Sequence, residues 1–395
     1  MSKIVFFCIP AHGHTNPTLG VVRELVARGH EVRYYSYEPF RNQIEDAGAK
    51  FIPCEAYDME QNLDPETAAK IGKDIALSTR ILVDTTLALD TIVCEDMKRF
   101  HPDCIVADSM AIWGKAVALK LHIPFISSTT TFAFNQYSAK VMKQSAGDLL
   151  RMVISMPKIN RDIKRLQDYG YPIHSLLDIM QNDAQTDTIV YTSAQFQPCA
   201  ETFPDNYAFV GPSIRPISTP FAKTRDKLIY IALGTVNTNM MKFYRNCIQA
   251  LKDTDYQTLL SVGELTDMKQ FGTLPDNITI ERHVDQIAVL AQADTFISHC
   301  GMNSVNESLY YRVPLIMYPQ TTEQGGVANR VAELGAGVYL KQNSPAQIRS
   351  AVEQVLHDPS YRQSASAISD GFQNCSGAAG AAEKILQVCK RNPLF

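Results

Sequence analysis

The chain has 395 residues, which at roughly 150 residues per domain predicts two or three domains. Its 45% hydrophobic and 20% charged residues are typical of an ordinary globular protein with enough apolar material for a large core. A net charge of −4, from 37 Lys+Arg against 41 Asp+Glu, argues against a dedicated nucleic-acid-binding protein, because such proteins normally carry a basic surface.

The cysteines and the N-terminus restrict the class further. The nine cysteines are scattered without a C-x-x-C pair, which predicts reduced thiols rather than a disulfide framework or a structural zinc site. The apolar run at the N-terminus is too short for the core of a signal peptide. No stretch approaches the roughly 18 apolar residues of a membrane-spanning helix. We therefore expect a cytoplasmic protein without a membrane span.

In the first half of the chain, strands and helices alternate. Ile4–Ile9 is a continuous apolar run, as expected for a strand that is covered on both faces. A short loop over Pro10–His14 then leads into a helix that extends through Arg28 and ends before Gly29. The later elements predicted in this half are the strands Val32–Tyr35, Cys104–Ala107 and Pro124–Ser127 and the helix Ala111–Leu121. This alternation predicts a parallel sheet with right-handed crossovers.

The alternation stops near residue 210 and then begins again. Prolines and glycines between Val210 and Thr224 indicate an interdomain linker. After it we expect the strands Leu228–Leu233, Gln257–Val262, Thr295–Ser298 and Leu315–Met317 and the helices Met240–Leu251, Asn303–Tyr311 and one that begins after Glu323. The fold class is therefore α/β, with two Rossmann-like domains whose parallel sheets face each other across a cleft. The expected parts are 1–209, the linker 210–224, 225–375, and a C-terminal helix within 376–395 that packs back on the first domain.

A long insertion between the strands near Ser127 and Thr188 contains many apolar side chains. Two interpretations stay open for its Met- and Phe-rich stripe: a buried face of a helical hairpin, or a flexible apolar wall for a hydrophobic ligand. The residues that would line such a wall are Phe132, Phe134, Met152 and Met180.

The segment 296–330 carries the strongest chemical signal. A strand ends at Ser298, the triplet His299-Cys300-Gly301 makes a turn, and a helix follows. The N-terminus of a helix offers unpaired N–H groups and a partial positive charge, which suit a phosphate. Gly301 allows close approach of the backbone, and His299, Asn303 and Ser304 add donors for a diphosphate. The alternative is that these residues only cap ordinary helices.

Two acidic positions extend this signal. Glu307 lies one turn further along the same helix, at a distance suited to two ribose hydroxyls. The adjacent Glu323 and Gln324 open the next helix, where a carboxylate and an amide together can hold several hydroxyls of a sugar.

The pattern H-x-G-x-N-S-x-x-E…P-x-x-x-E-Q resembles the donor signature of family 1 glycosyltransferases, which are UDP-sugar-dependent enzymes with the two-domain GT-B fold. It is most similar to the bacterial branch that glycosylates macrolides and other natural products. The resemblance extends to A-H-G-H-T-N-P near the N-terminus, to Leu233-Gly234-Thr235 and to Phe209-Val210-Gly211-Pro212. It therefore covers nearly the whole chain.

The resemblance implies a set of donor contacts. His299, Gly301, Asn303 and Ser304 would bind the diphosphate, with Thr235 touching a phosphate; Glu307 would bind the ribose, and Glu323 and Gln324 the transferred sugar. The family usually has Trp-x-Pro-Gln at the start of this signature, with its aromatic ring on uracil. Here the stretch reads His283-Val284-Asp285-Gln286. His283, Val284 and Gln286 are expected in the donor site, but an imidazole stacks with less area and Asp285 replaces a proline that stiffens the loop.

His14 and Asp108 form the second candidate group. Both follow strands of a parallel sheet, so they can meet at the carboxyl edge of that sheet. An imidazole is a suitable general base near neutral pH, and a carboxylate on its other nitrogen would fix the tautomer. The family's acceptor-activating dyad matches these two positions, and the match prefers His14 over the neighbouring His12. The alternative is that both residues cap helices.

These expectations combine into one function. The chain should be an inverting glycosyltransferase that transfers a sugar from a UDP-sugar to a small lipophilic acceptor such as a flavonoid, macrolide, steroid or other phenol. Because Gln324 ends the signature as in relatives that use glucose, UDP-glucose is the expected donor, with UDP-N-acetylglucosamine and UDP-galactose as alternatives. No metal or other cofactor is expected, and a monomer or weak dimer is. The competing hypotheses are a nucleotide-sugar epimerase and a non-catalytic auxiliary protein.

Three further sequence features could indicate a metal site or an acceptor contact, but we interpret them as structural. Asp253-Thr254-Asp255 resembles a metal-binding D-x-D, but it joins a helix end to a strand start, which is the wrong edge of the sheet. His12-Gly13-His14 lacks a third ligand at zinc-like spacing. Trp113 is expected in the core rather than on an acceptor.

Overall fold

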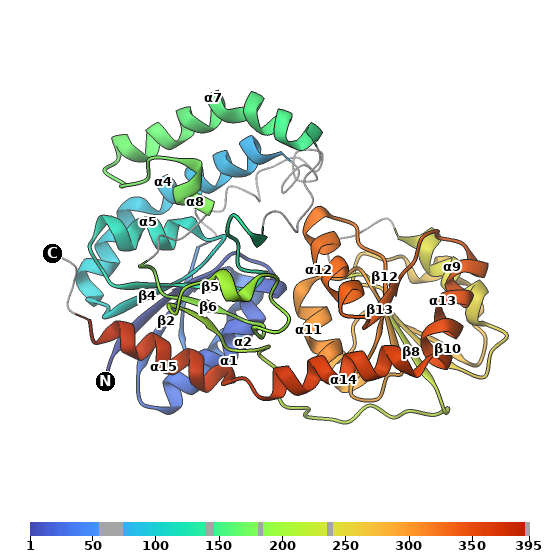
Figure 1. Ribbon diagram of the computed structural model, residues 1–395. Coiled ribbons are helices and arrows are strands. Elements are labelled where there is room, and N and C mark those ends of the chain that lie inside the picture. Colours follow the sequence, from blue (N-terminus) through green and yellow to red (C-terminus); the bar gives the residue numbers. More distant parts are fainter. Residues whose placement is uncertain (55–73, 139–145, 181–184, 235–239, 392–395) are drawn as a thin grey trace. The chain divides into compact units, whose positions relative to one another are not determined.

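The chain forms two compact units in a computed structural model that describes residues 1–54, 74–138, 146–180, 185–234 and 240–391 (Figure 1). Unit 1 comprises Met1–Ser213 and Ser376–Phe395, and unit 2 comprises Ile214–Cys375. The segment between the last strand of unit 1 and the first strand of unit 2, residues 210–227, has neither helix nor strand. The predicted linker lies within this segment, and the unit boundary falls after Ser213.

Unit 1 is built on a seven-stranded sheet in its described part, with the order β3-β2-β1-β4-β5-β6-β7 and every pairing parallel. Burial of β1 and β4 on both faces explains why their sequences are continuously apolar rather than alternating. The strands are β1 (Lys3–Phe7), β2 (Glu31–Ser36), β3 (Lys50–Pro53), β4 (Cys104–Asp108), β5 (Phe125–Thr129), β6 (Thr188–Val190) and β7 (Tyr207–Phe209).

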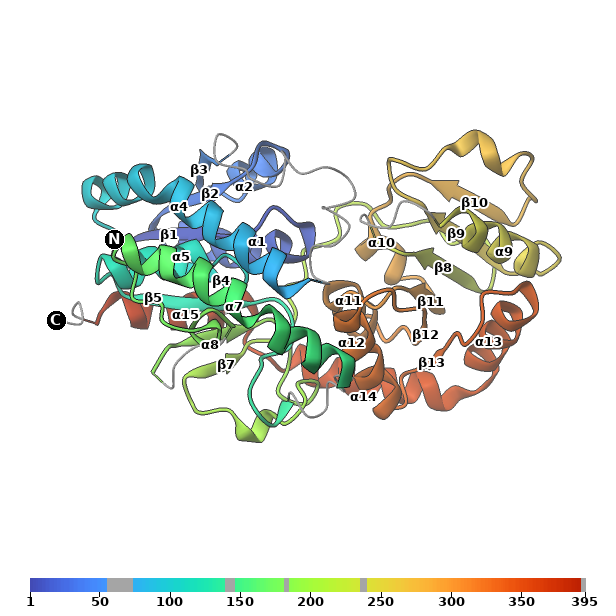
Figure 2. The ribbon, with the colours of Figure 1, turned by 90° about the horizontal axis from the view of Figure 1, so that it is seen from above.

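Helices cover both faces of this sheet. On one face, α5 packs on β4 and against α4, and α7 lies alongside α4 (Figure 2). On the other face, α15 packs beside α1 and against β4 and β5. The helices of unit 1 are α1 (His12–Ala27), α2 (Arg41–Asp46), α4 (Ile75–Phe100), α5 (Ile112–Lys120), α7 (Ala146–Asp168), α8 (Leu176–Met180) and α15 (Gly377–Cys389), with short 3₁₀ turns at Glu38–Phe40 and Ala200–Thr202.

The start of α1 differs from the sequence expectation. The predicted loop over Pro10–His14 is partly wrong, because α1 already begins at His12. The carbonyl of Ala11 accepts from the backbone N–H groups of His14 (3.0 Å) and Thr15 (2.9 Å), which closes a helical turn ahead of Pro17. His14 therefore lies on the first turn of a helix, where its side chain has a defined direction.

Helix α4 has no counterpart among the predicted elements. Asp74 caps its N-terminus by accepting from the backbone N–H groups of Ala76 and Leu77, and the helix ends at His101 in a left-handed conformation. Aspartate at the cap and Lys98 and Arg99 in the last turn are the signals that could have identified it.

The C-terminal helix α15 belongs to unit 1. Its amino end is held by the Gly377 N–H, which donates to the Val210 carbonyl at 2.7 Å. Near its other end, Lys384 lies 2.7 Å from the buried carboxylate of Asp187, and Arg391 also pairs with that carboxylate. Buried apolar side chains of α15, such as Ile385 and Val388, complete the contact with the core of unit 1.

Unit 2 repeats the same architecture, and its described residues form a six-stranded parallel sheet in the order β10-β9-β8-β11-β12-β13. Helices α9 and α13 pack together on one face, and α11 packs with α12 and α14 on the other (Figure 1). The strands are β8 (Leu228–Ala232), β9 (Gln257–Ser261), β10 (Ile278–Glu281), β11 (Thr295–Ser298), β12 (Leu315–Met317) and β13 (Gly337–Tyr339). The helices are α9 (Met241–Leu251), α10 (Gln286–Leu290), α11 (Met302–Tyr310), α12 (Thr322–Glu333), α13 (Pro345–His357) and α14 (Pro359–Gln373), and Met268–Phe271 is a 3₁₀ turn.

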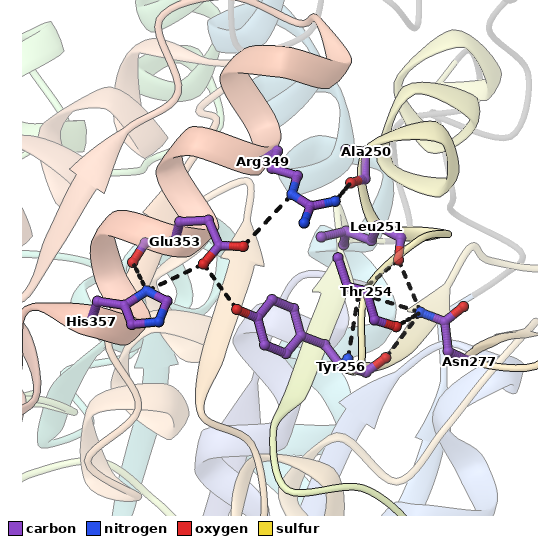
Figure 3. Close-up of polar contacts among 8 residues, drawn as sticks. All are labelled: Ala250, Leu251, Thr254, Tyr256, Asn277, Arg349, Glu353 and His357. Carbon is purple, nitrogen blue, oxygen red and sulfur yellow. Dashed lines mark hydrogen bonds and ion pairs between the residues drawn. The ribbon is translucent and has the colours of Figure 1, made fainter.

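The turn that carries Asp253-Thr254-Asp255 joins α9 to β9 at the amino edge of this sheet. Figure 3 shows the side-chain amide of Asn277 reaching into the turn, where it donates to the carbonyls of Leu251 (2.9 Å), Thr254 (3.1 Å) and Tyr256 (3.0 Å). The Tyr256 hydroxyl in turn donates to Glu353 of α13 at 2.9 Å. This network gives the turn a packing role at the edge opposite to the carboxyl ends of the strands.

Several smaller expectations can be compared with the described residues. Trp113 is 4% exposed within the core of unit 1, which confirms its assignment to the core. All nine cysteines lie in described segments and are free thiols. No helix in the described part of the chain is long and apolar enough to cross a bilayer.

Candidate active site

The order in which strands are added to the sheet of unit 1 reverses between β1 and β4, and the predicted dyad lies at this point. The two strands pair in parallel with Phe7 opposite Ala107, while the connections that follow them leave toward opposite faces. In open α/β sheets such a topological switch point opens a crevice at the carboxyl ends of the strands. His14 follows β1 on the first turn of α1, and Asp108 is the last residue of β4.

The structure brings these two side chains into direct contact. His14 Nδ1 lies 2.8 Å from Asp108 Oδ2, and the other carboxylate oxygen, Oδ1, accepts from the backbone N–H of Met110 at 2.8 Å. Only 1% of the Asp108 side chain is exposed, against 17% for His14. Because a carboxylate can only accept, the proton of a neutral imidazole is favoured on Nδ1, which leaves the lone pair on Nε2.

This contact goes beyond what helix capping alone requires, and the catalytic role of the pair stays a prediction. Asp108 is not the N-cap of α5, which is Ala111, and the bond from His14 goes to a residue 94 positions away rather than to its own helix. His12, the neighbouring histidine, is exposed and its ring packs against Phe40 at 4.9 Å.

Thr130 is a third member of this group that the sequence does not indicate. Its hydroxyl oxygen lies 3.0 Å from His14 Nδ1, on the same nitrogen that contacts Asp108. Thr130 is buried just after β5, at the same carboxyl edge of the sheet, and 116 residues separate it from His14. Nothing in a run of serines and threonines distinguishes this one, so no sequence signal could have selected it.

The surroundings of Asp108 are apolar and carry further titratable groups. Burial raises the pKa of the Cys8 thiol, and the negative charge of Asp108 raises it further. The pKa of the buried Tyr34 hydroxyl is also raised by burial, with smaller contributions from Cys8 and Asp108. Both groups are therefore neutral at physiological pH, and Asp108 is the local negative charge beside His14.

The switch point of unit 2 lies between β8 and β11 and holds His299. The strands pair with Ala232 opposite Ser298, so His299 and Gly234 follow adjacent strand ends. A Cβ atom at Gly234 would lie 2.8 Å from His299 Nε2, and one at Gly301 would lie 2.7 Å from the same atom. Both distances are shorter than side-chain contacts allow, so the imidazole fits only because two glycines flank it.

The chemistry of His299 follows from this enclosure. Burial lowers the pKa of His299 to about 4, although a backbone contact with Ala232 acts in the opposite direction. At neutral pH the ring is therefore uncharged and can donate a single N–H. No described residue offers a hydrogen-bond partner to its buried Nδ1 atom, which is costly unless a ligand, water or another part of the chain supplies one.

Helix α11 begins directly after this turn. Its N-cap is Gly301, and no side chain caps the helix there, so its first N–H groups face the carboxyl edge of the sheet. Asn303 and Ser304 are half-buried in the first turn. This arrangement suits an anion, because helix-terminal N–H groups and the helix dipole both favour negative charge.

Glu307 is held one turn further along by Gln286. The Gln286 amide nitrogen donates to Glu307 Oε2 at 2.6 Å and to Ser304 Oγ at 3.3 Å, while its oxygen accepts from the Tyr230 hydroxyl at 3.2 Å. Burial raises the pKa of Glu307 to about 7, and the bond from Gln286 opposes that shift. Four predicted donor residues, His299, Ser304, Glu307 and Gln286, thus share one end of the sheet.

Polar side-chain contacts arrange the stretch 283–286. His283 Nε2 lies 3.0 Å from Glu264, and both side chains are more than half exposed. Val284 is half-buried, and Asp285 caps α10 by accepting from the Ala288 N–H at 3.1 Å. Arg215 forms an ion pair with Asp285 and was not among the predicted site residues.

The remaining predicted donor residues lie at α12 or outside the described residues. Glu323 is exposed in the first turn of α12, and Gln324 accepts from the Gln320 N–H at 2.8 Å. Thr321 caps this helix by accepting from the Gln324 N–H at 3.3 Å. Thr235 lies outside the described residues.

The predicted acceptor residues have different surroundings. Phe132 is 5% exposed and its ring packs against Phe196 at 5.6 Å, so it contributes to packing. Phe134 is half-buried, and Met152 packs against the core of unit 1. The side chain of Met180 is not among those described. Acceptor contact by these residues stays a prediction.

Comparison with known proteins identifies relatives of the whole chain. Residues 245–380 match the family described as erythromycin biosynthesis protein CIII-like, C-terminal domain. The chain is 33% identical to the NDP-glycosyltransferase YjiC of Bacillus subtilis, with 97% of this chain and 96% of YjiC covered. It is 30% identical to the uncharacterized UDP-glucosyltransferase YdhE of the same organism, with 99% of both chains covered.

A solved structure supports the same assignment along the whole chain. The crystal structure of CalG4, the calicheamicin glycosyltransferase, is similar with a TM-score of 0.81 and 27% identity, and the alignment covers 99% of each chain. The two parallel sheets of the structure therefore agree with the fold of this solved relative. The chain belongs to the family of nucleotide-sugar-dependent glycosyltransferases and has the GT-B fold of that family's natural-product enzymes.

Proposed function

We propose that this glycosyltransferase moves glucose from UDP-glucose to a hydroxyl group of a small lipophilic acceptor, with inversion at the anomeric carbon. The observation that carries the proposal is the 2.8 Å contact between His14 and the buried carboxylate of Asp108 at the switch point of unit 1. A histidine held in this way is a base without a nucleophilic partner, which fits direct displacement.

In the proposed reaction, His14 Nε2 takes the proton from the acceptor hydroxyl. The oxygen then forms a bond to the anomeric carbon, and the bond between that carbon and the diphosphate oxygen breaks with its electron pair going to UDP. Asp108 stabilises the imidazolium that forms, and Thr130 helps to orient the ring through Nδ1. Attack from the face opposite UDP turns an α-linked donor into a β-glycoside.

The donor assignment is supported by unit 2. The N-terminus of α11 and the N–H of His299 would stabilise the negative charge that develops on the leaving diphosphate. Because His299 is neutral, it would contribute a hydrogen bond rather than a full positive charge. Relatives named as a UDP-glucosyltransferase and an NDP-glycosyltransferase support a nucleotide-sugar donor, and Gln324 at the end of the signature favours glucose. We infer that no metal ion is needed.

The acceptor class is proposed more broadly. CalG4 is named for glycosylation of calicheamicin, and the matched C-terminal family is named for erythromycin biosynthesis. Both names support a natural-product acceptor for this chain. We therefore propose phenols and alcohols of flavonoid, macrolide or steroid type.

The test is incubation of the purified chain with UDP-glucose and a panel of such acceptors, followed by mass spectrometry. We expect a product heavier by one hexose, a β-anomeric proton coupling in its NMR spectrum, and no loss of rate with EDTA. His14→Ala should abolish product while UDP binding, measured by calorimetry, stays near that of the wild type. Wild-type turnover by this variant would refute the base assignment. Conversion of UDP-glucose without acceptor would instead favour an epimerase, and UDP binding without transfer an auxiliary protein.

A further inference from the structure

Arg215 reaches the nucleotide side of unit 2 from the segment that leads into this unit. Its guanidinium forms an ion pair with Asp285, and Asp285 uses the same oxygen, Oδ1, to accept from the Ala288 N–H at 3.1 Å. The carboxylate therefore closes the turn 283–286 onto α10 and is itself held by Arg215. A proline is the usual stiffening residue here in the resembled family, so this chain stiffens the turn by an ion pair and a cap.

The next residue connects that turn to Glu307. The side-chain amide of Gln286 is oriented at both ends: its oxygen accepts from the Tyr230 hydroxyl at 3.2 Å, and its nitrogen donates to Glu307 Oε2 at 2.6 Å. If residue 285 moved, this amide would have to move with it. The position of the Glu307 carboxylate therefore depends on a contact made by Arg215, which is a separate residue far earlier in the chain.

Charge acts in the same direction as geometry. Burial raises the pKa of Glu307 to about 7; the positive charge of Arg215 lowers it, and the negative charge of Asp285 raises it. Among the described residues, Glu307 also interacts with the phenols Tyr230 and Tyr311, whose pKa values are raised mainly by burial. Loss of the Arg215 charge would leave Asp285 as an unopposed like charge, so Glu307 would hold its proton to higher pH.

We propose that Arg215 is a positioning residue of the donor site, which holds Gln286 and the ionised Glu307 carboxylate in the arrangement that binds the nucleotide's ribose. The proposal rests on the proposed role of Glu307 as the ribose ligand. An ionised carboxylate is needed there because it accepts from two hydroxyls without offering a competing proton.

A simpler interpretation is that the Arg215–Asp285 pair is only a surface salt bridge. The side chains are 45% and 30% exposed, and exposed pairs contribute about 0–1 kcal/mol to stability. That interpretation predicts a small stability change and no change in the pH dependence of nucleotide binding. The two interpretations therefore differ in a measurable quantity.

The experiment measures the Kd of UDP by calorimetry between pH 5.5 and 9 for the full chain and its variants. Dividing each variant's Kd by the wild-type value at the same pH cancels the ionisation of UDP itself. The variants are Arg215→Gln, Arg215→Lys, Asp285→Asn, the double variant Arg215→Gln with Asp285→Asn, and Glu307→Gln. Arg349→Gln is the matched control, because Arg349 is 44% exposed and pairs with Glu353 on α13 (Figure 3).

For Arg215→Gln we expect UDP to bind about tenfold more weakly than to the wild type near pH 5.5, about fivefold more weakly at pH 7 and about as tightly at pH 9, which corresponds to an upward shift of about one unit in the pKa of Glu307. Arg215→Lys should keep most of the wild-type affinity for UDP, because it keeps the positive charge. The double variant should move the midpoint back toward the wild type, because both charges next to Glu307 are removed. Arg349→Gln should leave the whole curve unchanged.

Each contrary result has a distinct meaning. An unchanged curve for Arg215→Gln, with Glu307→Gln weakening binding, overturns this inference and leaves the proposed function intact. Equal weakening by Arg215→Gln at every pH, with no effect of Asp285→Asn, means direct contact of Arg215 with the nucleotide and also overturns the positioning role, because positioning acts through Asp285. If Glu307→Gln itself binds UDP normally, the ribose assignment fails and the inference fails with it.

Discussion

Replacing Asp108 by asparagine should inactivate the enzyme by changing which nitrogen of His14 carries the proton. Asp108 Oδ1 accepts from the Met110 N–H at 2.8 Å, and Oδ2 faces His14 Nδ1 at 2.8 Å. An asparagine keeps its single oxygen on Met110, because its NH₂ group cannot accept from that N–H. The NH₂ group then faces Nδ1, which must become an acceptor, and the ring proton moves to Nε2. In that tautomer Nε2 cannot take a proton from the acceptor.

The size of the effect can be worked from this geometry. A hydrogen bond to a charged group contributes about 1.5–3 kcal/mol, which corresponds to about 10- to 150-fold in rate. The wrong tautomer adds to this loss, and the equivalent exchange in a serine-protease triad costs about 10⁴-fold. We therefore expect kcat to fall by about 10²- to 10⁴-fold.

The assay is steady-state transfer from UDP-glucose to a phenolic acceptor, combined with calorimetric titration of UDP. Asp108 lies in unit 1 and the proposed donor residues lie in unit 2, so the Kd of UDP should not change. Asp103→Asn is the matched control, because Asp103 caps the opposite end of β4 by accepting from the Lys3 N–H at 2.8 Å. An Asp108→Asn enzyme that kept more than about one tenth of wild-type kcat would refute the tautomer argument.

Three further predictions concern unit 2 and the C-terminal helix. Gly301→Ala places a Cβ 2.7 Å from His299 Nε2 and should displace the ring, which would weaken UDP binding about tenfold by calorimetry; unchanged affinity would contradict the fit of the imidazole. Since the pKa of His299 is about 4, below its ordinary value, unfolded chains bind more protons between pH 4 and 6.5, and stability is lost as the pH falls through this window. Between pH 7 and pH 4.5, the free energy of unfolding in urea should fall by roughly 2–3 kcal/mol less for His299→Gln than for the wild type. Equal decreases in the two proteins would refute the burial argument. Asp187→Asn leaves Lys384 and Arg391 without their carboxylate and should destabilise the chain by about 3 kcal/mol, with the fastest hydrogen exchange appearing in α15; an unchanged exchange rate there would mean that apolar packing alone holds the helix.

Much of the architecture could be predicted from local patterns. The apolar runs Ile4–Ile9 and Leu228–Leu233 correspond to β1 and β8. A strand that is buried on both faces is apolar along its whole length, so it can be recognised as a continuous apolar run. The strands Thr295–Ser298 and Leu315–Met317 coincide with β11 and β12. The start of α1 was predicted too late, because the carbonyl of Ala11 already closes the first helical turn at His14 and Thr15.

The candidate site also has a part that local sequence patterns predict and a part that they do not. Residues that are close in the sequence and are proposed to bind one ligand, such as His299, Ser304 and Glu307, produce a recognisable spacing, because a turn and a helix repeat fix their relative positions. His14, Asp108 and Thr130 come from three separate strand ends, and Arg215 meets Asp285 across 70 residues. The sequence by itself therefore determined which residue types were available at the strand ends and to which family the chain is similar. Only the tertiary structure decided which nitrogen of His14 faces Asp108 and which cation holds the turn at Asp285, since parallel pairing of distant strands creates these neighbours and no local spacing encodes them.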